Sequence, residues 1–214
     1  MHVGVLGTGD VGKALGKGFV TLGHDVKMGS REAKNEKALA WAKQMGAKAS
    51  VGTFADAASF GEIVVLATLG VVNESVLKMA GPQKLRGKVV IDATNPLDFS
   101  GGIPPKLAVT GDDSAGERVQ RLLPEAHVVK AFNTVGNPFM FRPEFPGGPP
   151  DMFIAGNNDD AKKKVSAILK DFGWGVVDVG GVESSRYLEA MCMVWVLSAI
   201  RTNNWNQAFK LLRK

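Results

Sequence analysis

The chain has 214 residues, which suits one large domain or one domain with a smaller appendage. Its formal net charge is +5, and its cations are scattered instead of forming the basic stripe with stacking aromatics that nucleic-acid binding requires. The single cysteine, Cys192, excludes an internal disulfide and, with no signal peptide expected, favours a cytoplasmic location. The longest near-continuous apolar segment, residues 188–200, is too short to span a bilayer, so we expect no membrane partner.

A glycine-rich motif follows a short apolar run at residues 2–6. Its spacing is G-x-G-x-x-G, and its residues are Gly7, Thr8, Gly9, Asp10, Val11 and Gly12. With a helix predicted from Asp10, Gly7 permits the tight turn, Gly9 lets a phosphate approach the backbone, and Gly12 allows close packing of helix on strand. The helix N-terminus would present free N–H groups to a pyrophosphate, so we predict dinucleotide binding. The alternative is a glycine-rich turn that binds nothing.

The end of the second predicted strand, residues 25–29, indicates which dinucleotide is bound. NAD-binding units usually carry Asp or Glu about 20 residues after the glycines, whereas this chain has Ser30 and Arg31. A carboxylate would repel a 2′-phosphate, but Ser30 can donate a hydrogen bond, Arg31 can form a charge-assisted fork, and Lys34 adds a cation. We therefore predict NADP(H). Alternatively, Ser30 caps a helix that begins near Glu32.

Alternating helices and strands are predicted after this point. They are a helix at 35–45 with Leu39, Ala42 and in one reading Trp41 facing inward, a strand at 47–51, a helical turn at 54–58, a strand at 62–68, a helix at 73–79, a strand at 88–93, a helix to Leu123 opened by a capping box at 114–117, and a strand at 127–131. This alternation predicts an α/β fold with a Rossmann-type doubly wound parallel sheet.

The composition changes after residue 135, because residues 137–150 carry five prolines and two adjacent glycines. This segment is predicted to be an extended crossing or lid loop. A strand at 151–156, a helix at 159–172, a strand at 174–179 and a long helix from about 184 follow. We predict a Rossmann NADP-binding domain at 1–135 and a small C-terminal α/β extension at 136–214 that packs on it and serves the acceptor and oligomerisation.

Polar residues follow several predicted strands at the edge where open sheets bind ligands. Thr68 and Leu69 end one strand and Asn95 and Pro96 end another, so they are candidates to hold the nicotinamide, with ordinary turn chemistry as the alternative. Lys130 ends a third strand and can lie at the ligand crevice, although it could equally be a surface cation. We therefore take it as a weak catalytic candidate.

Other polar and aromatic side chains are predicted to be structural. His2, His24 and His127 fall at strand starts or turns, and Tyr187 completes the set of potential proton donors. Core or subunit contacts are predicted for the helical side chains Met191, Met193, Trp195 and Trp205. Cys192 has no activating neighbour in the sequence, so we expect it to be buried, and we predict no metal site.

Four segments carry a family resemblance that spans nearly the whole chain. They are residues 7–12, residues 29–31, residues 128–134 and residues 178–189, which include Gly180-Gly181 and Ser185-Arg186. In these segments the chain resembles the NADP oxidoreductases dependent on coenzyme F420, a deazaflavin, and the NADPH-binding domain of six-transmembrane metalloreductases. The resemblance implies NADP(H) on the first sheet with Thr8, Ser30 and Arg31 at the 2′-phosphate. It also makes Asn133 a cofactor-binding and weak catalytic candidate.

The predicted function is hydride transfer between NADPH and a flavin-type or deazaflavin acceptor, which is a small molecule. This chemistry needs stacking and orientation more than acid–base groups, because the cofactors carry it. We expect no set of six hydrophobic spans, which would set the chain apart from the metalloreductases. Two alternatives are an imine or carbonyl reductase of the pyrroline-5-carboxylate reductase type and an NADPH-binding redox sensor without turnover. A homodimer is compatible with the sequence.

Overall fold

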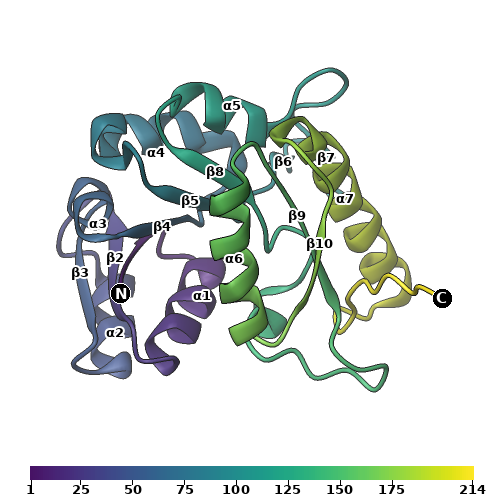
Figure 1. Ribbon diagram of the computed structural model, residues 1–214, viewed down its shortest axis with the longest axis horizontal. Coiled ribbons are helices and arrows are strands. Elements are labelled where there is room, and N and C mark those ends of the chain that lie inside the picture. The colour runs from purple at the N-terminus through teal and green to yellow at the C-terminus, as the bar shows by residue number, and fades with distance from the viewer.

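A computed structural model describes all 214 residues as an eight-stranded sheet covered by helices (Figure 1). The first region contains β1 (His2–Leu6), α1 (Asp10–Thr21), β2 (Asp25–Ser30), α2 (Glu36–Met45), β3 (Ala49–Thr53), α3 (Phe54–Phe60), β4 (Ile63–Leu66), α4 (Asn73–Ala80), β5 (Val89–Asp92), α5 (Ala115–Leu122) and β8 (His127–Lys130). The 3-10 turn η1 (Gly70–Val72) precedes α4, and the 3-10 turn η2 (Pro82–Leu85) lies between α4 and β5. The hairpin strands β6 (Leu97–Asp98) and β7 (Lys106–Leu107) lie between β5 and α5.

The second region extends the same sheet. It contains η3 (Asn137–Phe139), β9 (Asp151–Gly156), α6 (Asp159–Asp171), β10 (Gly175–Asp178), η4 (Val182–Ser184) and α7 (Ser185–Thr202). The strand order is β10-β9-β8-β5-β4-β1-β2-β3, and each neighbouring pair is parallel except β8 with β9. The predicted Rossmann-type doubly wound sheet with a C-terminal extension packed on it is confirmed.

Strand side chains alternate between two cores, one on each face of the sheet. In β4, Ile63 and Val65 join a cluster of 27 buried residues that includes side chains of α1, α2 and α6. Val64 and Leu66 point the other way, into a cluster of 15 buried residues with α3, α4 and α5. Because successive side chains of a strand face opposite sides, a strand buried on both faces must be apolar throughout. The run at 63–66 satisfies this requirement.

Two glycines allow the close turn between β1 and α1. Gly7 has a φ of 131°, which disfavours any residue with a side chain, and a Cβ there would collide with the carbonyl group of Ala67. A Cβ on Gly12 would collide in the same way with the carbonyl oxygen of Gly7. The glycines therefore bring the N-terminus of α1 directly to the carboxyl end of β1.

The core is continuous across the predicted domain boundary. Met152 and Ile154 of β9 and Val165 of α6 belong to the same 27-residue cluster as β1 and α1. The boundary at 135/136 thus falls inside one sheet and one core, and the division into two domains stays a prediction. The reversal of direction between β8 and β9 was not foreseen, because an apolar strand pattern carries no direction.

Several local predictions need correction. Leu39, predicted to face inward, is 44% exposed, whereas Trp41 is buried and its indole Nε1 donates to the carbonyl oxygen of Lys13. The helix after β2 begins at Glu36 and is capped by Asn35, so the alternative that Ser30 caps a helix near Glu32 is wrong. The helical turn predicted at 54–58 is the longer helix α3.

None of the helices in the structure has both the length and the apolar character that a membrane span requires.

Candidate functional site

A cleft of about 1130 Å³ lies where β1, β2, β4 and β5 reach their carboxyl ends. Its lining residues are Gly7, Thr8, Gly9, Asp10, Val11, Ser30, Arg31, Glu32, Asn35, Phe54, Ala67, Thr68, Leu69, Val72, Ser75, Val76, Met79, Ala93, Thr94, Asn95, Leu97 and Asn137. Ligands of open α/β sheets bind at this edge. Most of the predicted cofactor residues are therefore brought together in one cleft of sufficient size for a dinucleotide.

The glycine turn forms one wall of the cleft and leaves donors free. Gly9 is the N-cap of α1 and no side chain caps this end, so the N–H groups of the first turn have no partner within the helix. A Cβ built on Gly9 would meet no atom within 4 Å, which leaves the space above the backbone open. Free N–H groups at a helix N-terminus beside open space suit a pyrophosphate. Gly12 is buried under this turn and acts by packing alone.

The loop after β2 forms the end of the cleft at which a 2′-phosphate is expected. Arg31 is exposed, lines the cleft and forms no ion pair within the chain, so its guanidinium is free for an anion. Ser30 is buried, and its hydroxyl donates to the carbonyl oxygen of Glu32 and accepts from the N–H of Glu32 at 3.2 Å. Ser30 therefore shapes the turn that presents Arg31. Lys34 is exposed and does not line the cleft.

A chain of side-chain hydrogen bonds joins the loops after β4 and β5. The hydroxyl of Thr68 donates to Asn73 Oδ1 at 3.0 Å, and Asn73 Nδ2 donates to Thr94 Oγ1 at 2.8 Å. The Thr94 hydroxyl in turn donates to Asp92 Oδ1 at 2.7 Å. Because Thr68 and Thr94 both line the cleft, this series of hydrogen bonds fixes the distance between the walls formed after β4 and β5. Asn73 and Asp92, which were not predicted as site residues, are buried.

Two asparagines join the cleft to α7. Asn95 lines the cleft, its Nδ2 donates to the carbonyl oxygen of Asn133 at 2.8 Å, and its Oδ1 accepts from Asn133 Nδ2 at 3.0 Å. Asn133 is only 2% exposed, also donates to the carbonyl oxygen of Leu188 and leaves its own Oδ1 without a partner. Asn133 thus supports Asn95 from behind. Pro96 faces a separate small cavity of about 180 Å³.

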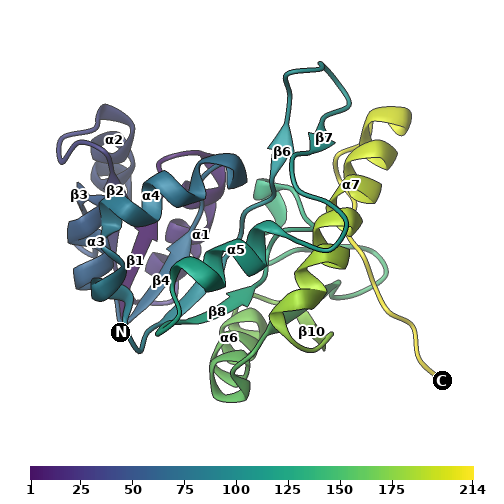
Figure 2. The same cartoon turned by 90° about the horizontal axis from the view of Figure 1, so that it is seen from above.

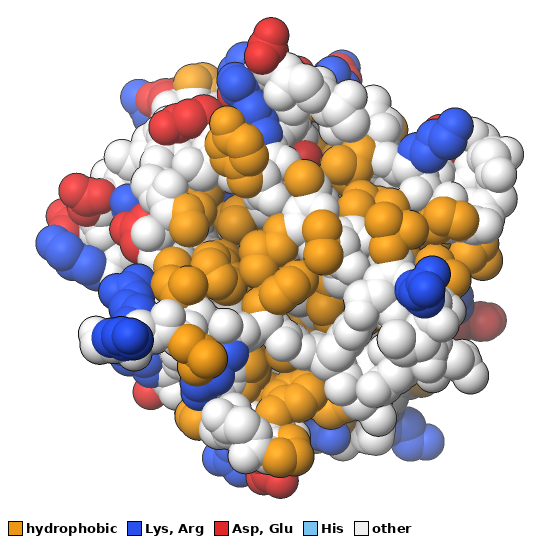
Figure 3. Space-filling model, turned by 90° about the vertical axis from the view of Figure 1, so that its right-hand side faces the viewer, with side chains coloured by type: hydrophobic (Ala, Val, Ile, Leu, Met, Phe, Trp, Pro, Cys, Tyr) orange, Lys and Arg blue, Asp and Glu red, His pale blue; other side chains and the backbone are white.

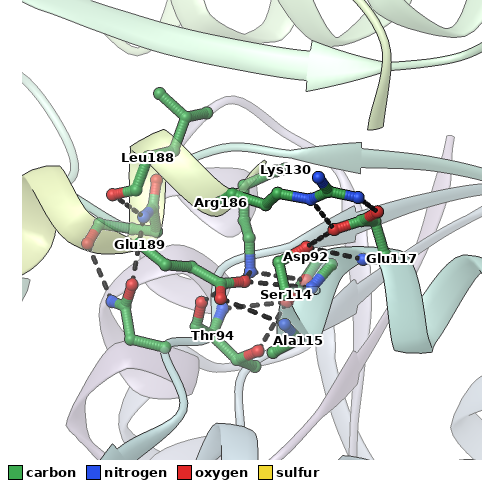
Figure 4. Close-up of polar contacts among 12 residues, drawn as sticks. Asp92, Thr94, Ser114, Ala115, Glu117, Lys130, Arg186, Leu188 and Glu189 are labelled. Atoms are coloured by element: carbon green, nitrogen blue, oxygen red, sulfur yellow. Dashed lines mark hydrogen bonds and ion pairs between the residues drawn. The ribbon is translucent and has the colours of Figure 1, made fainter. Parts of the chain in front are cut away.

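A fully buried ion cluster lies behind this wall (Figure 4). Lys130 Nζ donates to Asp92 Oδ2 and Glu189 Oε1 at 2.8 Å each and to the carbonyl oxygen of Thr94 at 2.9 Å. Burial alone would lower the pKa of Lys130, but the attraction and hydrogen bonds of Asp92 and Glu189 outweigh it, so the pKa is raised. The alternative that Lys130 is a surface cation is wrong. Its three N–H bonds are all used, and the structure does not bring it to the cleft lining.

The first turns of α7 also hold α5. The Glu189 carboxylate accepts the N–H groups of Ala115 and Gly116 at 3.0 Å each, at the start of α5. Arg186 forms two hydrogen bonds with Glu117, and it lowers the pKa of that carboxyl. Sequence reasoning missed these carboxylates as site-supporting groups. The signal available was an acid within an apolar run, as for Asp92 in β5 and Glu189 in α7.

The remaining potential acid–base groups lie away from the cleft. His2, His24, His127 and Tyr187 are absent from its lining, and burial lowers the pKa of His24. Cys192 is buried as predicted, and burial raises the pKa of its thiol to about 12. No group of three or more His, Cys, Asp or Glu side chains is arranged to hold a metal ion. The titratable side chains of the cleft are Asp10, Arg31 and Glu32, all beside the glycine turn or after β2.

Comparison with known proteins found a matching family model and relatives of similar length. Residues 2–96 match the family model described as NADP oxidoreductase coenzyme F420-dependent. The F420-dependent NADP reductase of Methanothermobacter marburgensis is 30% identical over 99% of this chain and 98% of its own. A crystal structure of a candidate F420-dependent NADP-reductase from Arthrobacter sp. FB24 superposes with a TM-score of 0.94 and 37% identity, covering 99% of both chains.

More distant likenesses are partial. The metalloreductase STEAP3 of Rattus norvegicus is 29% identical over 88% of this chain but only 36% of its own length. A reductive aminase from Aspergillus terreus is 17% identical with a TM-score of 0.68, over 94% of this chain and 62% of its own, which shows a shared fold alone. On the full-length likenesses, the chain belongs to the coenzyme F420-dependent NADP oxidoreductase family and is an NADP-dependent oxidoreductase.

Proposed function

We propose that this protein catalyses hydride transfer between NADP(H) and a deazaflavin of the coenzyme F420 type. The proposal is supported by the chain's membership of a family whose relatives are F420-dependent NADP reductases. One observation of the cleft carries it further. The walls formed after β4 and β5 hold amides, hydroxyls and apolar side chains, and no titratable side chain lines them.

The absence of a proton donor at these walls discriminates between reaction types. Reduction of a ketone or imine needs a placed acid for the developing anion or amine. When bound, the nicotinamide exchanges a hydride at its C4 with the acceptor ring, and this step needs stacking and orientation instead. The lining of Thr68, Leu69, Thr94, Asn95 and Leu97 suits the second task. A flavin could enter by the same chemistry, and it stays the alternative acceptor.

Most of the predicted cofactor residues receive a role in this proposal, whereas Lys34 and Pro96, which do not line the cleft, receive none. The backbone N–H groups at the start of α1, over Gly9, Asp10 and Val11, hold the pyrophosphate. Arg31 pairs with the 2′-phosphate, and Thr8 lies in the same cleft. Gly7 and Gly12 shape the turn, and Ser30 shapes the loop that carries Arg31.

At the other end, the proposal assigns the nicotinamide to the loops after β4 and β5. The Thr68 hydroxyl and the Asn95 side chain are the polar groups there that can orient the carboxamide, and Leu69 offers an apolar surface. Asn133 acts through Asn95, with which it exchanges two hydrogen bonds. Lys130 acts one step further back, because its ammonium holds the carbonyl oxygen of Thr94. Lys130 is therefore proposed as a positioning residue.

The test is a panel of acceptors supplied to the purified full chain. We expect NADPH to be oxidised when oxidised F420 is present, and NADP⁺ to be reduced when reduced F420 is present. Flavin mononucleotide, a cyclic imine and a simple ketone form the other arms. Turnover with the imine or ketone alone would identify a reductase of that class and refute the proposal. NADPH binding without turnover in any arm would instead identify a redox sensor.

A further inference from the structure

Thr68 is the point at which a series of buried hydrogen bonds reaches the cleft. It is half-buried, lines the cleft after β4, and its Oγ1 lies 3.0 Å from Asn73 Oδ1. Its methyl group faces the glycine turn, because a Cβ built on Gly7 would lie 3.3 Å from it. A hydroxyl has one proton and two lone pairs. The side chain therefore offers the cleft either a donor or only an acceptor, depending on where its proton is used.

The buried end of this series has a fixed polarity. Asp92 is fully buried and lies 2.8 Å from the ammonium of Lys130 (Figure 4), so this carboxyl carries a negative charge and has no proton to donate. Its Oδ1 lies 2.7 Å from Thr94 Oγ1. The proton between these two oxygens must therefore come from Thr94. On its other side, the Thr94 oxygen is left with lone pairs alone.

Asn73 carries this polarity from Thr94 to Thr68. It is the first residue of α4, which lies between α3 and α5 in Figure 2, and it is only 4% exposed. Because the Thr94 oxygen offers lone pairs alone, the amide atom 2.8 Å from it must be the donor, Nδ2. The other amide atom, Oδ1, faces Thr68 and can only accept. Thr68 must therefore use its one proton on Asn73, away from the cleft.

We infer that Thr68 presents only lone pairs to the cleft and so selects a dinucleotide whose pyridine ring carries an N–H donor there, as the carboxamide of NADP(H) does. This inference rests on the proposed function, which assigns the nicotinamide to the loops after β4 and β5. Thr68 is thereby a specificity-determining residue. Asn73, which fixes the direction of the Thr68 proton, is a positioning residue.

Asn95 supplies the complementary donor. One N–H of its Nδ2 is used by the carbonyl oxygen of Asn133, and the other has no acceptor within the chain, whereas its Oδ1 already accepts from Asn133 Nδ2. The N–H of Gly70 donates to the carbonyl oxygen of Asn95 at 3.1 Å, so the loops after β4 and β5 lie side by side. An acceptor on one loop and a donor on the other favour one orientation of the carboxamide, with its amino group toward Thr68 and its oxygen toward Asn95.

Two analogues of NADP⁺ separate the donor from the acceptor half of the carboxamide. The thionicotinamide analogue keeps the amino group, and the 3-acetylpyridine analogue keeps the carbonyl oxygen but carries a methyl group in place of the amino group. With the acetyl analogue, the Thr68 oxygen loses its hydrogen bond and faces a methyl group instead. A site built to bond an N–H discriminates against a ligand that lacks it, because a polar group is left unpaired. The acetyl analogue should therefore bind about 10-fold more weakly than NADP⁺.

The test titrates the purified full chain with NADP⁺ and the two analogues by isothermal calorimetry. We expect the thionicotinamide analogue to bind like NADP⁺ and the acetyl analogue to bind more weakly. Equal affinity for the two analogues, or tighter binding of the acetyl analogue, would overturn the inference. The measurement needs no hydride acceptor, so it is separate from the acceptor panel. Failure to reduce F420 would refute the proposed function and leave this order of affinities unchanged.

Substitutions at Thr68 test whether this side chain is the source of the preference. Thr68→Val removes the oxygen with little change of shape, so the ratio of the two affinities should fall to about 1, and Thr68→Ser should keep the preference. Thr202→Val makes the same change outside the cleft, at the end of α7, where an exposed hydroxyl donates to the carbonyl oxygen of Ser198. This helix lies on the side that faces the viewer in Figure 3, and none of its residues lines the cleft. A preference that persists in Thr68→Val would overturn the inference.

Asn73→Leu tests the direction of the hydrogen bonds. Leucine has no acceptor for the Thr68 proton, so the hydroxyl can turn and donate to a carbonyl oxygen in the cleft. The acetyl analogue should then gain affinity relative to NADP⁺, whereas general loss of structure would weaken all three ligands alike. An unchanged ratio, or an equal loss for all three ligands, in a variant that circular dichroism shows to be folded would overturn the role of Asn73. The titrations of the unaltered chain and of Thr68→Val test the preference even if this variant does not fold.

Discussion

Replacement of Lys130 by methionine would remove the cation between two buried carboxylates. Asp92 is 0% exposed and Glu189 is 1% exposed, so water cannot solvate either carboxylate in place of the lost ammonium. Breaking a buried ion pair from one side costs about 3–5 kcal/mol. Each carboxylate keeps other donors here, from Thr94 for Asp92 and from Ala115 and Gly116 for Glu189. We therefore expect the lower end of this range, about 3 kcal/mol.

The loss should be measured by urea unfolding at neutral pH, and a chain of this size should also melt roughly 6–12 °C lower. Addition of Glu189→Gln to Lys130→Met should restore part of the stability, since it removes one of the uncompensated charges. A loss below about 1 kcal/mol, or no recovery in the double variant, would refute the buried-cluster reasoning.

Three further predictions concern the cleft and its support. Arg31→Glu should weaken NADPH binding by about 10- to 100-fold through lost pairing and added repulsion, while NADH binding changes little. Lys34→Glu makes the same charge reversal outside the cleft and is the control in the binding titrations. Equal losses for NADPH and NADH would contradict the role of Arg31 at the 2′-phosphate. Asn95→Ala should slow hydride transfer at least ~10-fold in stopped-flow traces, with a smaller change in NADPH affinity, because the side chain proposed to orient the carboxamide is removed from the cleft. Arg186 lowers the pKa of Glu117, so the stability from this pair is present above the ordinary carboxyl pKa of about 4.3 and is lost as the pH falls through the folded-state pKa. Glu117→Gln should therefore make the melting temperature less sensitive to acid. A melting temperature that depends on pH as in the unaltered chain would contradict this role of the pair.

The architecture and the position of the cleft could be predicted from local patterns. Gly7, Gly9 and Gly12 follow an apolar strand and precede a helix, and this order produces the turn that the structure contains. Apolar runs such as 63–66 are buried on both faces, which is what a central parallel strand requires. These signals are confined to a few neighbouring residues, so a single sequence can reveal them.

Features that depend on distant partners could not be predicted. Lys130 gains its place from Asp92 and Glu189, which lie 38 and 59 residues away, and no local pattern links the three positions. β8 and β9 are antiparallel because of the path that the loop at 137–150 takes between them. The proline content of this loop does not specify that path. Leu39 fits the inward face of a helical pattern, but it is exposed in the structure. Trp41 is the side chain of α2 that packs into the 27-residue core cluster.

The central claim, that hydride passes directly between NADPH and a deazaflavin in this cleft, can be tested by isotope transfer. The purified chain would be mixed with NADPH carrying deuterium at the transferred position of nicotinamide C4, with oxidised F420 as acceptor, in ordinary water. We expect the deuterium on carbon in the reduced deazaflavin, because direct transfer breaks the C–D bond at nicotinamide C4 and forms a new C–D bond that does not exchange with water. Loss of the deuterium to water, or no reduction of F420, would contradict it.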